Sequence, residues 1–433
     1  MLLIFSTRPL LAFFLFFIFV TSSNAAILNI APESVEAESW MIFDPQTEQV
    51  IAAHNADAQR APASLTKMMV AYLTLEAIHA GQLKTTDTIT ATSVVNYVKS
   101  DESKMGLKVG EHITVDQLLS GLIVMSANDA AVTLAEKISG NLPQFIEKMN
   151  ATAQQLGMSN THFTNPAGIT MVDHYSSASD LVKLSDQLIK KHPEYLNYSK
   201  QQSYAWDDLT HKATNLLLKK DDTIDGLKTG YTAAAGFNFA LTAKRMTADS
   251  TLPERRLIVV VLGTKSKFKR AQVANQLMNL AFAYTQDVVA LKANQPLFQL
   301  PVVNGEQKSF TFAYKNNKIL TTSLYPKDTP IQLQNFDINT GVVVENKQSV
   351  LPLNQQQIKL NITLDQKQLI APLNREMLLA NVTILQNNQP IDTLKISAPI
   401  VLERANLFER LIHWLRQILP FMSNQTAEAI IYQ

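Results

Sequence analysis

The sequence predicts an α/β domain with an antiparallel sheet flanked by helices, followed by a smaller all-β domain. Strand-like segments stand at both ends of residues 26–286 and helical segments fill the middle, so one sheet would be assembled from both ends of that domain. After about Asp287, short segments of alternating polarity are separated by Asn, Gln, Pro and Gly residues, which predicts an all-β domain over residues 287–400. The length of 433 residues also favours more than one domain.

The composition is that of a globular protein without a strong net charge. Hydrophobic residues make up 46% of the chain and charged residues 17%, which suits a large core. With 38 basic and 37 acidic residues the net charge is +1, so we expect no nucleic-acid partner. The chain has no cysteine, which removes disulfides, thiolate metal sites and cysteine nucleophiles.

Residues 1–25 have the pattern of a secretory signal peptide. Arg8 precedes an apolar run over residues 9–20, and Ser23 and Ala25 follow at the spacing that a signal peptidase accepts. We expect cleavage after Ala25 and export of the mature protein. The alternative is an uncleaved membrane anchor, although the run is short for a full span.

Local patterns predict the elements of both domains. Residues 37–55 are typical of two strands around an Asp-Pro turn, and a mostly helical region then extends to about Gln202. Residues 237–245 and 255–263 are two further predicted strands, and a helix from about Lys267 to Thr285 closes the domain. In the second domain, the sequence QNNQP predicts a hairpin turn.

The segment 401–422 predicts an amphipathic helix at a membrane surface. Its apolar side chains gather on one helical face and its charged and polar side chains on the other, with Trp414 near the boundary. The segment is too polar to span a bilayer. The alternative is that this helix packs on the all-β domain. Residues 423–433 are expected to form a tail after the helix.

The first candidate for chemistry is a lysine in an apolar stretch. In PASLTKMMVAYL, Ser64 and Lys67 are three residues apart and share one face of a helix. The apolar neighbours predict that Lys67 is buried, which lowers the pKa of its amine and makes it a general base beside a nucleophile. Taken alone, this pattern is better interpreted as a serine that caps the N-terminus of a helix and a lysine whose amine reaches water.

Two later motifs change that interpretation. SAN, at Ser126 to Asn128, follows an apolar run, and KTG, at Lys228 to Gly230, precedes a predicted strand. Alone, SAN is typical of a helix cap and KTG of a turn. The three motifs in the order S-x-x-K, S-x-N, K-T-G form a far more specific set.

Each residue of this set has a physical task. Ser126 can pass a proton between Lys67 and a leaving amine, and Lys228 puts positive charge near a substrate carboxylate while lowering the pKa of Lys67 further. The other candidates bind or orient a substrate: Asn128 by its amide, Thr229 by its hydroxyl, Gly230 by close backbone approach, and Tyr231 by an N–H that completes an oxyanion hole with that of Ser64. We expect no metal and no other cofactor.

The ordered motifs are similar to the signature of penicillin-binding proteins and serine β-lactamases. Within that group, the segments ASLTKMM, SANDAAVTLAE, THFTNPAGI, YSSASDL and DGLKTGYT resemble the D-alanyl-D-alanine carboxypeptidases of the penicillin-binding protein 5 type. The resemblance covers residues 38–285, and the small β domain with a terminal amphipathic helix also resembles that family. It implies a β-lactamase-like DD-peptidase fold.

The resemblance also implies a function and a place in the cell. It implies a serine peptidase on the periplasmic side of the cytoplasmic membrane that removes the terminal D-alanine from peptidoglycan pentapeptide stems and that β-lactam antibiotics acylate. Carried over by residue, Ser64 is the acylated nucleophile, Lys67 the proton acceptor, Ser126 the third catalytic residue and Lys228 a substrate-binding residue.

Three positions depart from the family pattern. Many members have His where Tyr231 follows KTG, and His-Gly-Leu where this chain has Ala167, Gly168 and Ile169. The family often places an arginine for the substrate carboxylate where this chain has Lys265, which keeps the charge but loses the planar fork. These differences bear on rate and substrate preference.

Three other functions are compatible with parts of the sequence. A β-lactamase of class A would carry a Glu-x-x-x-Asn element after the middle motif, and residues 142–166 contain none. A D,D-endopeptidase would use the same acyl-enzyme on another bond. A wall-binding scaffold protein with a decayed site would have lost a motif residue, and this chain keeps all of them.

Overall fold

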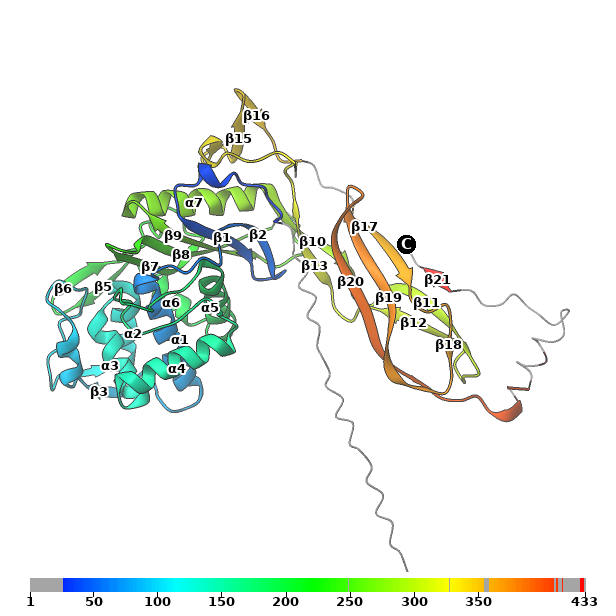
Figure 1. Ribbon diagram of the computed structural model, residues 1–433, viewed down its shortest axis with the longest axis horizontal. Helices are drawn as coiled ribbons and strands as arrows, with labels where there is room; N and C mark the ends of the chain where they lie inside the picture. The colour runs from blue at the N-terminus through cyan, green and yellow to red at the C-terminus, as the bar shows by residue number, and fades with distance from the viewer. Residues whose placement is uncertain are drawn as a thin grey trace, which may run out of the picture.

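The computed structural model is built on a five-stranded antiparallel sheet with the strand order β2-β1-β9-β8-β7 (Figure 1). The bounds of its strands are β1 (Ser39–Asp44), β2 (Gln49–His54), β7 (Ile224–Thr232), β8 (Gly236–Arg245) and β9 (Arg255–Thr264). β1 pairs with β9, so a hairpin from the start of the domain joins three strands from its end. The predicted assembly of the sheet from both ends is confirmed.

The structure describes part of the chain, namely residues 26–247, 249–326, 328–353, 358–408, 410–411, 415 and 429–431. The predicted signal peptide lies outside these residues, and so does most of the predicted amphipathic helix. At the start of that helix, the described residues Leu407, Phe408 and Leu411 are exposed. No helix among the described residues is long and apolar enough to cross a membrane.

Helices cover both faces of the central sheet (Figure 1). On one face lie α1 (Lys67–His79), α2 (Val115–Ser120), α3 (Asn128–Ser139), α4 (Leu142–Gln155), α5 (Ala178–Lys191) and α6 (Tyr195–Ser199), and α7 (Lys267–Tyr284) covers the other. Strand β9 shows the consequence of this double cover. Ile258 and Val260 belong to the core under α1–α6, and Val259 and Val261 belong to the core under α7, as expected for alternating side chains.

Two small two-stranded sheets lie at the rim of the helical layer. They are β3 (Thr88–Thr90) with β4 (His112–Thr114), and β5 (Ser203–Trp206) with β6 (Leu209–Lys212). Trp206 of β5 donates its indole N–H to the carbonyl of Met105 over 3.0 Å, which ties the β5–β6 hairpin to the loop that precedes β4.

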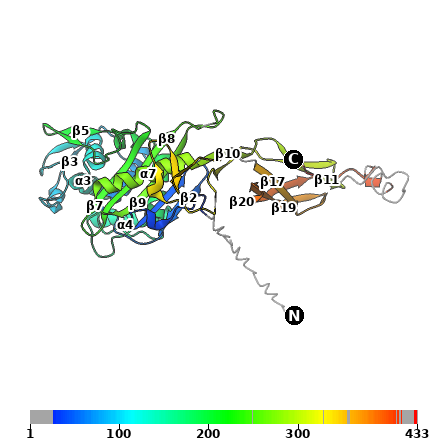
Figure 2. The same cartoon turned by 90° about the horizontal axis from the view of Figure 1, so that it is seen from above.

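The second part of the described chain consists of strands and extends away from the first (Figure 2). Its strands are β10 (Thr285–Leu291), β11 (Pro296–Val303), β12 (Ser309–Ala313), β13 (Lys318–Ser323), β17 (Ile358–Leu364), β18 (Leu369–Ile370), β19 (Leu373–Gln386), β20 (Gln389–Leu402) and β21 (Ile430–Ile431). Asn387 and Asn388, both with positive φ, form the two-residue turn between β19 and β20, where a hairpin turn is predicted.

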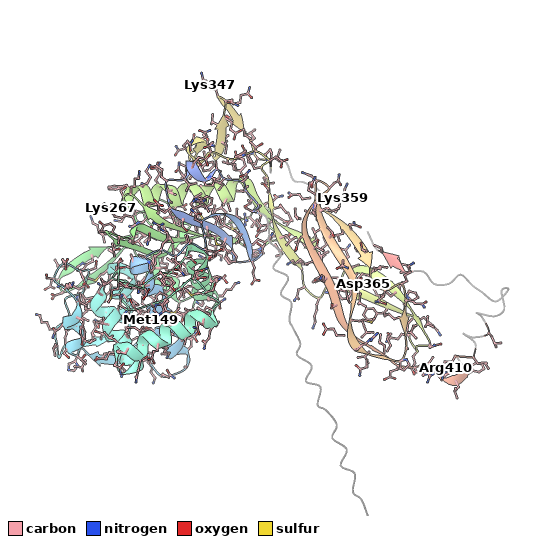
Figure 3. The ribbon with its side chains drawn as sticks, in the orientation of Figure 1. Met149, Lys267, Lys347, Lys359, Asp365 and Arg410 are labelled. Atoms are coloured by element: carbon pink, nitrogen blue, oxygen red, sulfur yellow. The ribbon has the colours of Figure 1, made fainter. Side chains whose placement is uncertain are left out.

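One segment within the predicted all-β range packs on the first domain instead. Residues 324–353 carry β14 (Phe336–Asp337), β15 (Val342–Glu345) and β16 (Gln348–Val350), and they lie over α7 (Figure 1). Tyr325 and Phe336 are buried in the same core as Tyr284 of α7. In Figure 3, Lys347 marks the tip of the β15–β16 hairpin, beyond α7.

Candidate active site

Ser64 and Lys67 lie where a short 3-10 helix, Ala63–Thr66, leads into α1. Lys67 is the first residue of α1, and its amine donates a hydrogen bond to the hydroxyl of Ser64 over 3.0 Å. A second hydrogen bond, over 2.5 Å, goes to the carbonyl of Ala167. The amine is therefore held between the serine and a backbone oxygen from a distant part of the chain.

The surroundings of Lys67 decide its protonation. Its side chain is 1% exposed. Burial lowers the pKa of Lys67 to about 7, against the opposing effect of the carboxylates of Glu102 and Asp129, which favour the charged form. Near neutral pH a large fraction of the amine is thus uncharged and able to accept a proton.

Ser126 is positioned by a change of helix type. The π-helical turn Gly121–Met125 ends at Ser126, which has a left-handed backbone with φ of 64°, and α3 begins two residues later at Asn128. The hydroxyl of Ser126 accepts a hydrogen bond from the amine of Lys228 over 2.9 Å. The sequence predicted a link between Ser126 and Lys67, whereas the hydrogen bond in the structure joins Ser126 to Lys228.

The sequence predicted that KTG precedes a strand. In the structure, Lys228 lies inside strand β7. Residues 224–232 pair with β8 along their length, and this pairing holds their backbone extended. Burial also lowers the pKa of Lys228, and the positive charges of Lys67 and Arg270 lower it further. Burial is thus the first cause of the lowered pKa of both lysines, and the repulsion between their positive charges, which belongs to the pair, contributes to the lowered pKa of Lys228.

Two glycines let other parts of the backbone approach the segment that carries Ser64. A Cβ at Gly230 would lie 2.9 Å from the backbone nitrogen of Ser64, and a Cβ at Gly168 would lie 2.0 Å from the carbonyl oxygen of Ala63. Gly168 also has a φ of +84°. The sequence predicted a close approach of substrate at Gly230, but in the structure its near neighbour is the segment that carries Ser64.

Asn128 is held by an acidic residue that the sequence analysis missed. Its side-chain amide donates to the carboxylate of Glu102 over 2.6 Å, and its backbone N–H donates to the carbonyl of Ser103 over 2.7 Å. The next residue, Asp129, accepts three backbone N–H bonds from residues 105–107, over 2.8 to 3.0 Å. Asn128 and Asp129 thus together fix the loop that carries Glu102.

Arg270 of α7 is a second residue that sequence reasoning missed. Its guanidinium donates to the carbonyls of Gly230 over 3.1 Å, Asn238 over 3.4 Å and Thr214 over 3.4 Å. Thr214 also accepts a hydrogen bond from the hydroxyl of Thr229 over 2.6 Å. A signal existed, because Arg270 shares helical spacing with the buried Val273, Ala274 and Leu277, and an arginine on an apolar face needs partners.

Tyr231 and Lys265 lie at one end of the sheet. The side chain of Tyr231 is 54% exposed and stacks on Phe237, with 4.2 Å between ring centroids. The strand register aligns Tyr231 with Phe237 and Phe237 with Thr264, so Lys265 comes one residue after this row. Lys265 is exposed.

This geometry defines a class of protein. A serine beside a buried amine whose pKa is lowered to about 7, between a helical layer and the edge strand of an antiparallel sheet, is suited to acyl transfer by a serine enzyme without a histidine base. Residues 26–266 match the model of the D-alanyl-D-alanine carboxypeptidase family, and the chain belongs to that family. It is a serine-type D-Ala-D-Ala carboxypeptidase, as the resemblance in its sequence implied.

The chain is also similar in sequence and structure to individual members of this family. The D-alanyl-D-alanine carboxypeptidase DacA of Haemophilus influenzae is 33% identical over 293 residues, which are 67% of this chain and 73% of that protein. The crystal structure of penicillin-binding protein 5 from Haemophilus influenzae superposes with a TM-score of 0.71 and 28% identity, covering 87% of this chain and all of that one. Penicillin-binding protein D2 of Listeria monocytogenes, solved with ampicillin bound, has a TM-score of 0.50 and 31% identity, covering 56% of this chain and 96% of that one.

Proposed function

We propose that Ser64 is the nucleophile of this carboxypeptidase and that Lys67 is its general base. The observation that carries the proposal is the 3.0 Å contact between the serine hydroxyl and an amine whose pKa is lowered to about 7. The neutral amine takes the hydroxyl proton while the Ser64 oxygen attacks the carbonyl carbon of the bond between the last two D-alanines. The N–H groups of Ser64 and Tyr231 stabilise the resulting oxyanion.

The Ser126–Lys228 pair serves the leaving group. As the C–N bond breaks, the amine of the terminal D-alanine needs a proton, and the hydroxyl of Ser126 donates it and regains one from the neighbouring lysines. The hydrogen bond from Lys228 to Ser126 supports this role. Water then hydrolyses the ester on Ser64, with Lys67 again accepting a proton. Lys228, Thr229 and Lys265 bind the substrate carboxylate, and Asn128 binds its amide.

A β-lactam antibiotic enters the same reaction as an alternative acylating agent. Its strained amide presents a carbonyl to Ser64, and its leaving amine stays attached to the acyl group. Binding of ampicillin by the related Listeria protein supports this proposal.

A single set of assays tests the nucleophile and the reaction. The mature chain, residues 26–433, is incubated with labelled penicillin and, separately, with a pentapeptide that ends in D-Ala-D-Ala. We expect label on Ser64 and release of one D-alanine, and the absence of both would overturn the proposal. Ser64→Ala should abolish both signals, whereas Ser203→Ala, which changes an exposed serine of β5, should abolish neither.

The same assays separate the alternatives. Cleavage of a cross-linked stem dimer in preference to the pentapeptide would indicate an endopeptidase. Rapid release of hydrolysed penicillin would indicate a β-lactamase. A protein that binds wall fragments without label or product would be a scaffold.

We also propose that the protein works on the periplasmic side of the cytoplasmic membrane and is held there by the amphipathic segment 401–422. The signal-peptide pattern and the exposed apolar side chains of Leu407, Phe408 and Leu411 support this. Deleting the chain end would also remove β21, which pairs with β11, so substitutions are a cleaner test.

The double variant Leu407→Glu with Leu411→Glu should move the protein from the membrane to the soluble fraction and leave peptide hydrolysis unchanged. Ile370→Glu, at an exposed apolar residue of β18 outside the segment, is the control and should stay on the membrane. Membrane retention of the double variant would place the anchor elsewhere.

A further inference from the structure

A cluster of two histidines and a glutamate lies at the end of α1 that is opposite to Lys67. His79 is the last residue of α1, His192 follows α5, and Glu194 precedes α6. Each of the three offers one nitrogen or oxygen atom, and these atoms all lie within 4.8 Å of one another. His79 comes twelve positions after Lys67 in α1, about 18 Å along the helix axis, so the cluster is distinct from the catalytic site.

Three polar atoms of this cluster, on His192 and Glu194, lack the hydrogen bonds that burial normally requires. His192 is fully buried, and neither of its ring nitrogens has a hydrogen-bond partner among the described residues. Oε1 of Glu194 is buried and without such a partner as well. A buried imidazole with two unsatisfied nitrogens costs free energy unless another group occupies the space that they face.

Close contacts surround these atoms without satisfying them. Nε2 of His79 lies 2.8 Å from Oε1 of Glu194, and Nδ1 of His192 lies 3.8 Å from the same oxygen. Nε2 of His192 lies 2.8 Å from Oε1 of Glu76. The three short distances are ion-pair contacts between imidazole nitrogens and carboxylate oxygens.

The spacing matches the donor set of a transition-metal ion. In tetrahedral zinc sites the metal–nitrogen and metal–oxygen distances are about 2.0–2.2 Å, which puts ligand atoms roughly 3.3–3.5 Å apart. The contacts of 2.8 and 3.8 Å bracket this value. Two imidazoles and a carboxylate suit Zn²⁺ far better than the all-oxygen sites of Mg²⁺ or Ca²⁺.

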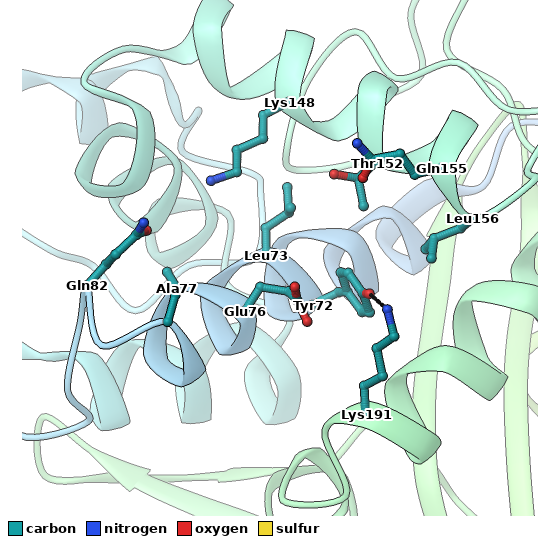
Figure 4. Close-up of a pocket in the computed structure, with 11 residues that line it drawn as sticks. Tyr72, Leu73, Glu76, Ala77, Gln82, Lys148, Thr152, Gln155, Leu156 and Lys191 are labelled. Carbon is teal, nitrogen blue, oxygen red and sulfur yellow. Dashed lines mark hydrogen bonds between the residues drawn. The ribbon is translucent and has the colours of Figure 1, made fainter.

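Glu76 lies beside the cluster and can accept a hydrogen bond from His192. A histidine that binds a metal through one nitrogen commonly donates its other N–H to a carboxylate, which fixes the ring. Nδ1 of His192 lies 3.8 Å from the Glu194 carboxylate and Nε2 lies 2.8 Å from the Glu76 carboxylate, so each ring nitrogen has within reach the partner that such a site requires. Glu76 also lines a pocket with Tyr72 and Lys191, which Figure 4 shows beside α1. Tyr72 meets His192 edge-on at 5.0 Å between ring centroids and supports the ring from that side.

We propose that His79, His192 and Glu194 bind a zinc ion, with Glu76 orienting His192 and water as the fourth ligand. The ion fastens the C-terminal end of α1 to the junction of α5 and α6. α6 in turn contacts β7 through the hydrogen bond from Ser199 to Asp225. The ion therefore stabilises the packing of α1, which carries Lys67, and of β7, which carries KTG. It takes no part in acyl transfer.

The test uses the mature chain without a histidine tag, freed of metal with a chelator. Titration with Zn²⁺ should give one bound ion per chain and raise Tm by about 5–10 °C when free zinc is about 100 times Kd, whereas Mg²⁺ should leave Tm unchanged. Co²⁺ should give the strong visible absorption bands of a tetrahedral site. The absence of these bands together with an unchanged Tm would overturn the proposal.

Variants assign the ligands. His79→Gln and Glu194→Gln should remove both the cobalt bands and the zinc-dependent rise in Tm, and Glu76→Gln should weaken zinc binding about 10- to 100-fold. His112→Gln, at an exposed histidine of β4, is the control and should bind zinc like the unchanged chain. Retention of the bands in both His79→Gln and Glu194→Gln would show that the metal binds elsewhere. Penicillin acylation should persist in every variant, so loss of the metal is distinguishable from loss of the enzyme.

Discussion

The amine of Lys67 lies 3.0 Å from the hydroxyl oxygen of Ser64 and is almost completely shielded from water. The charged amine loses its hydration there, so burial lowers the pKa of Lys67 to about 7. A lysine in water would be charged at neutral pH and could not accept the serine proton. Proximity and pKa are therefore consequences of one packing arrangement.

The rate of acylation by penicillin should rise with pH through an apparent pKa of about 7. The neutral amine is the active form, and its fraction falls to about one tenth at pH 6, so the rate there should be about one tenth of the plateau. Stopped-flow measurement from pH 5 to 9 checks this. Lys67→Arg keeps a charge at every pH and should acylate at least a hundredfold more slowly. A flat profile for the unchanged chain would contradict the assignment of the base.

Glu102→Gln should shift the acid limb of that profile to lower pH. The carboxylate of Glu102 raises the pKa of Lys67, so its removal lowers that pKa further. The amide oxygen of the new glutamine can still accept the hydrogen bond from Asn128. The same pH series measures the shift, and Glu147→Gln, at an exposed residue of α4, should leave the profile in place.

Gly168→Ala should reduce acylation at least tenfold and lower the free energy of unfolding by roughly 3 kcal/mol. The new Cβ would stand 2.0 Å from the carbonyl oxygen of Ala63 and push the segment that carries Ser64. Gly81→Ala is a matched control, because Gly81 also has a positive φ but open space around it. It should cost only about 1 kcal/mol and leave acylation intact. Urea unfolding and acylation kinetics measure both variants.

Arg270→Met should destabilise the protein by about 1–3 kcal/mol and slow acylation. The substitution leaves three backbone carbonyls, including that of Gly230, without their donor. Since Gly230 lies against the backbone of Ser64, its displacement reaches the nucleophile. Lys267→Met, at an exposed residue of the same helix, should change neither quantity. Unaltered acylation in Arg270→Met would limit Arg270 to a role in stability.

Most of the local structure was predictable from the sequence. The apolar runs of β8 and β9, the N-terminal hairpin and the turn at Asn387 and Asn388 follow from residue pattern and turn chemistry. KTG was the exception. Lys228 and Thr229 are polar residues, and only pairing with β8 reveals that they belong to a strand.

The sequence by itself determined the order of the motifs and the contact of Ser64 with Lys67, because residues three apart on a helical turn meet whatever the rest of the chain does. Tertiary structure decided which groups act on that pair. The amine of Lys228 donates a hydrogen bond to Ser126, 102 residues away, and Asn128 donates one to Glu102. Arg270 donates to the carbonyl of Gly230. At the far end of α1, the packing brings together His79, His192 and Glu194. Local spacing carries no information about such contacts, because they exist only once the helices have packed on the sheet and excluded water from between them.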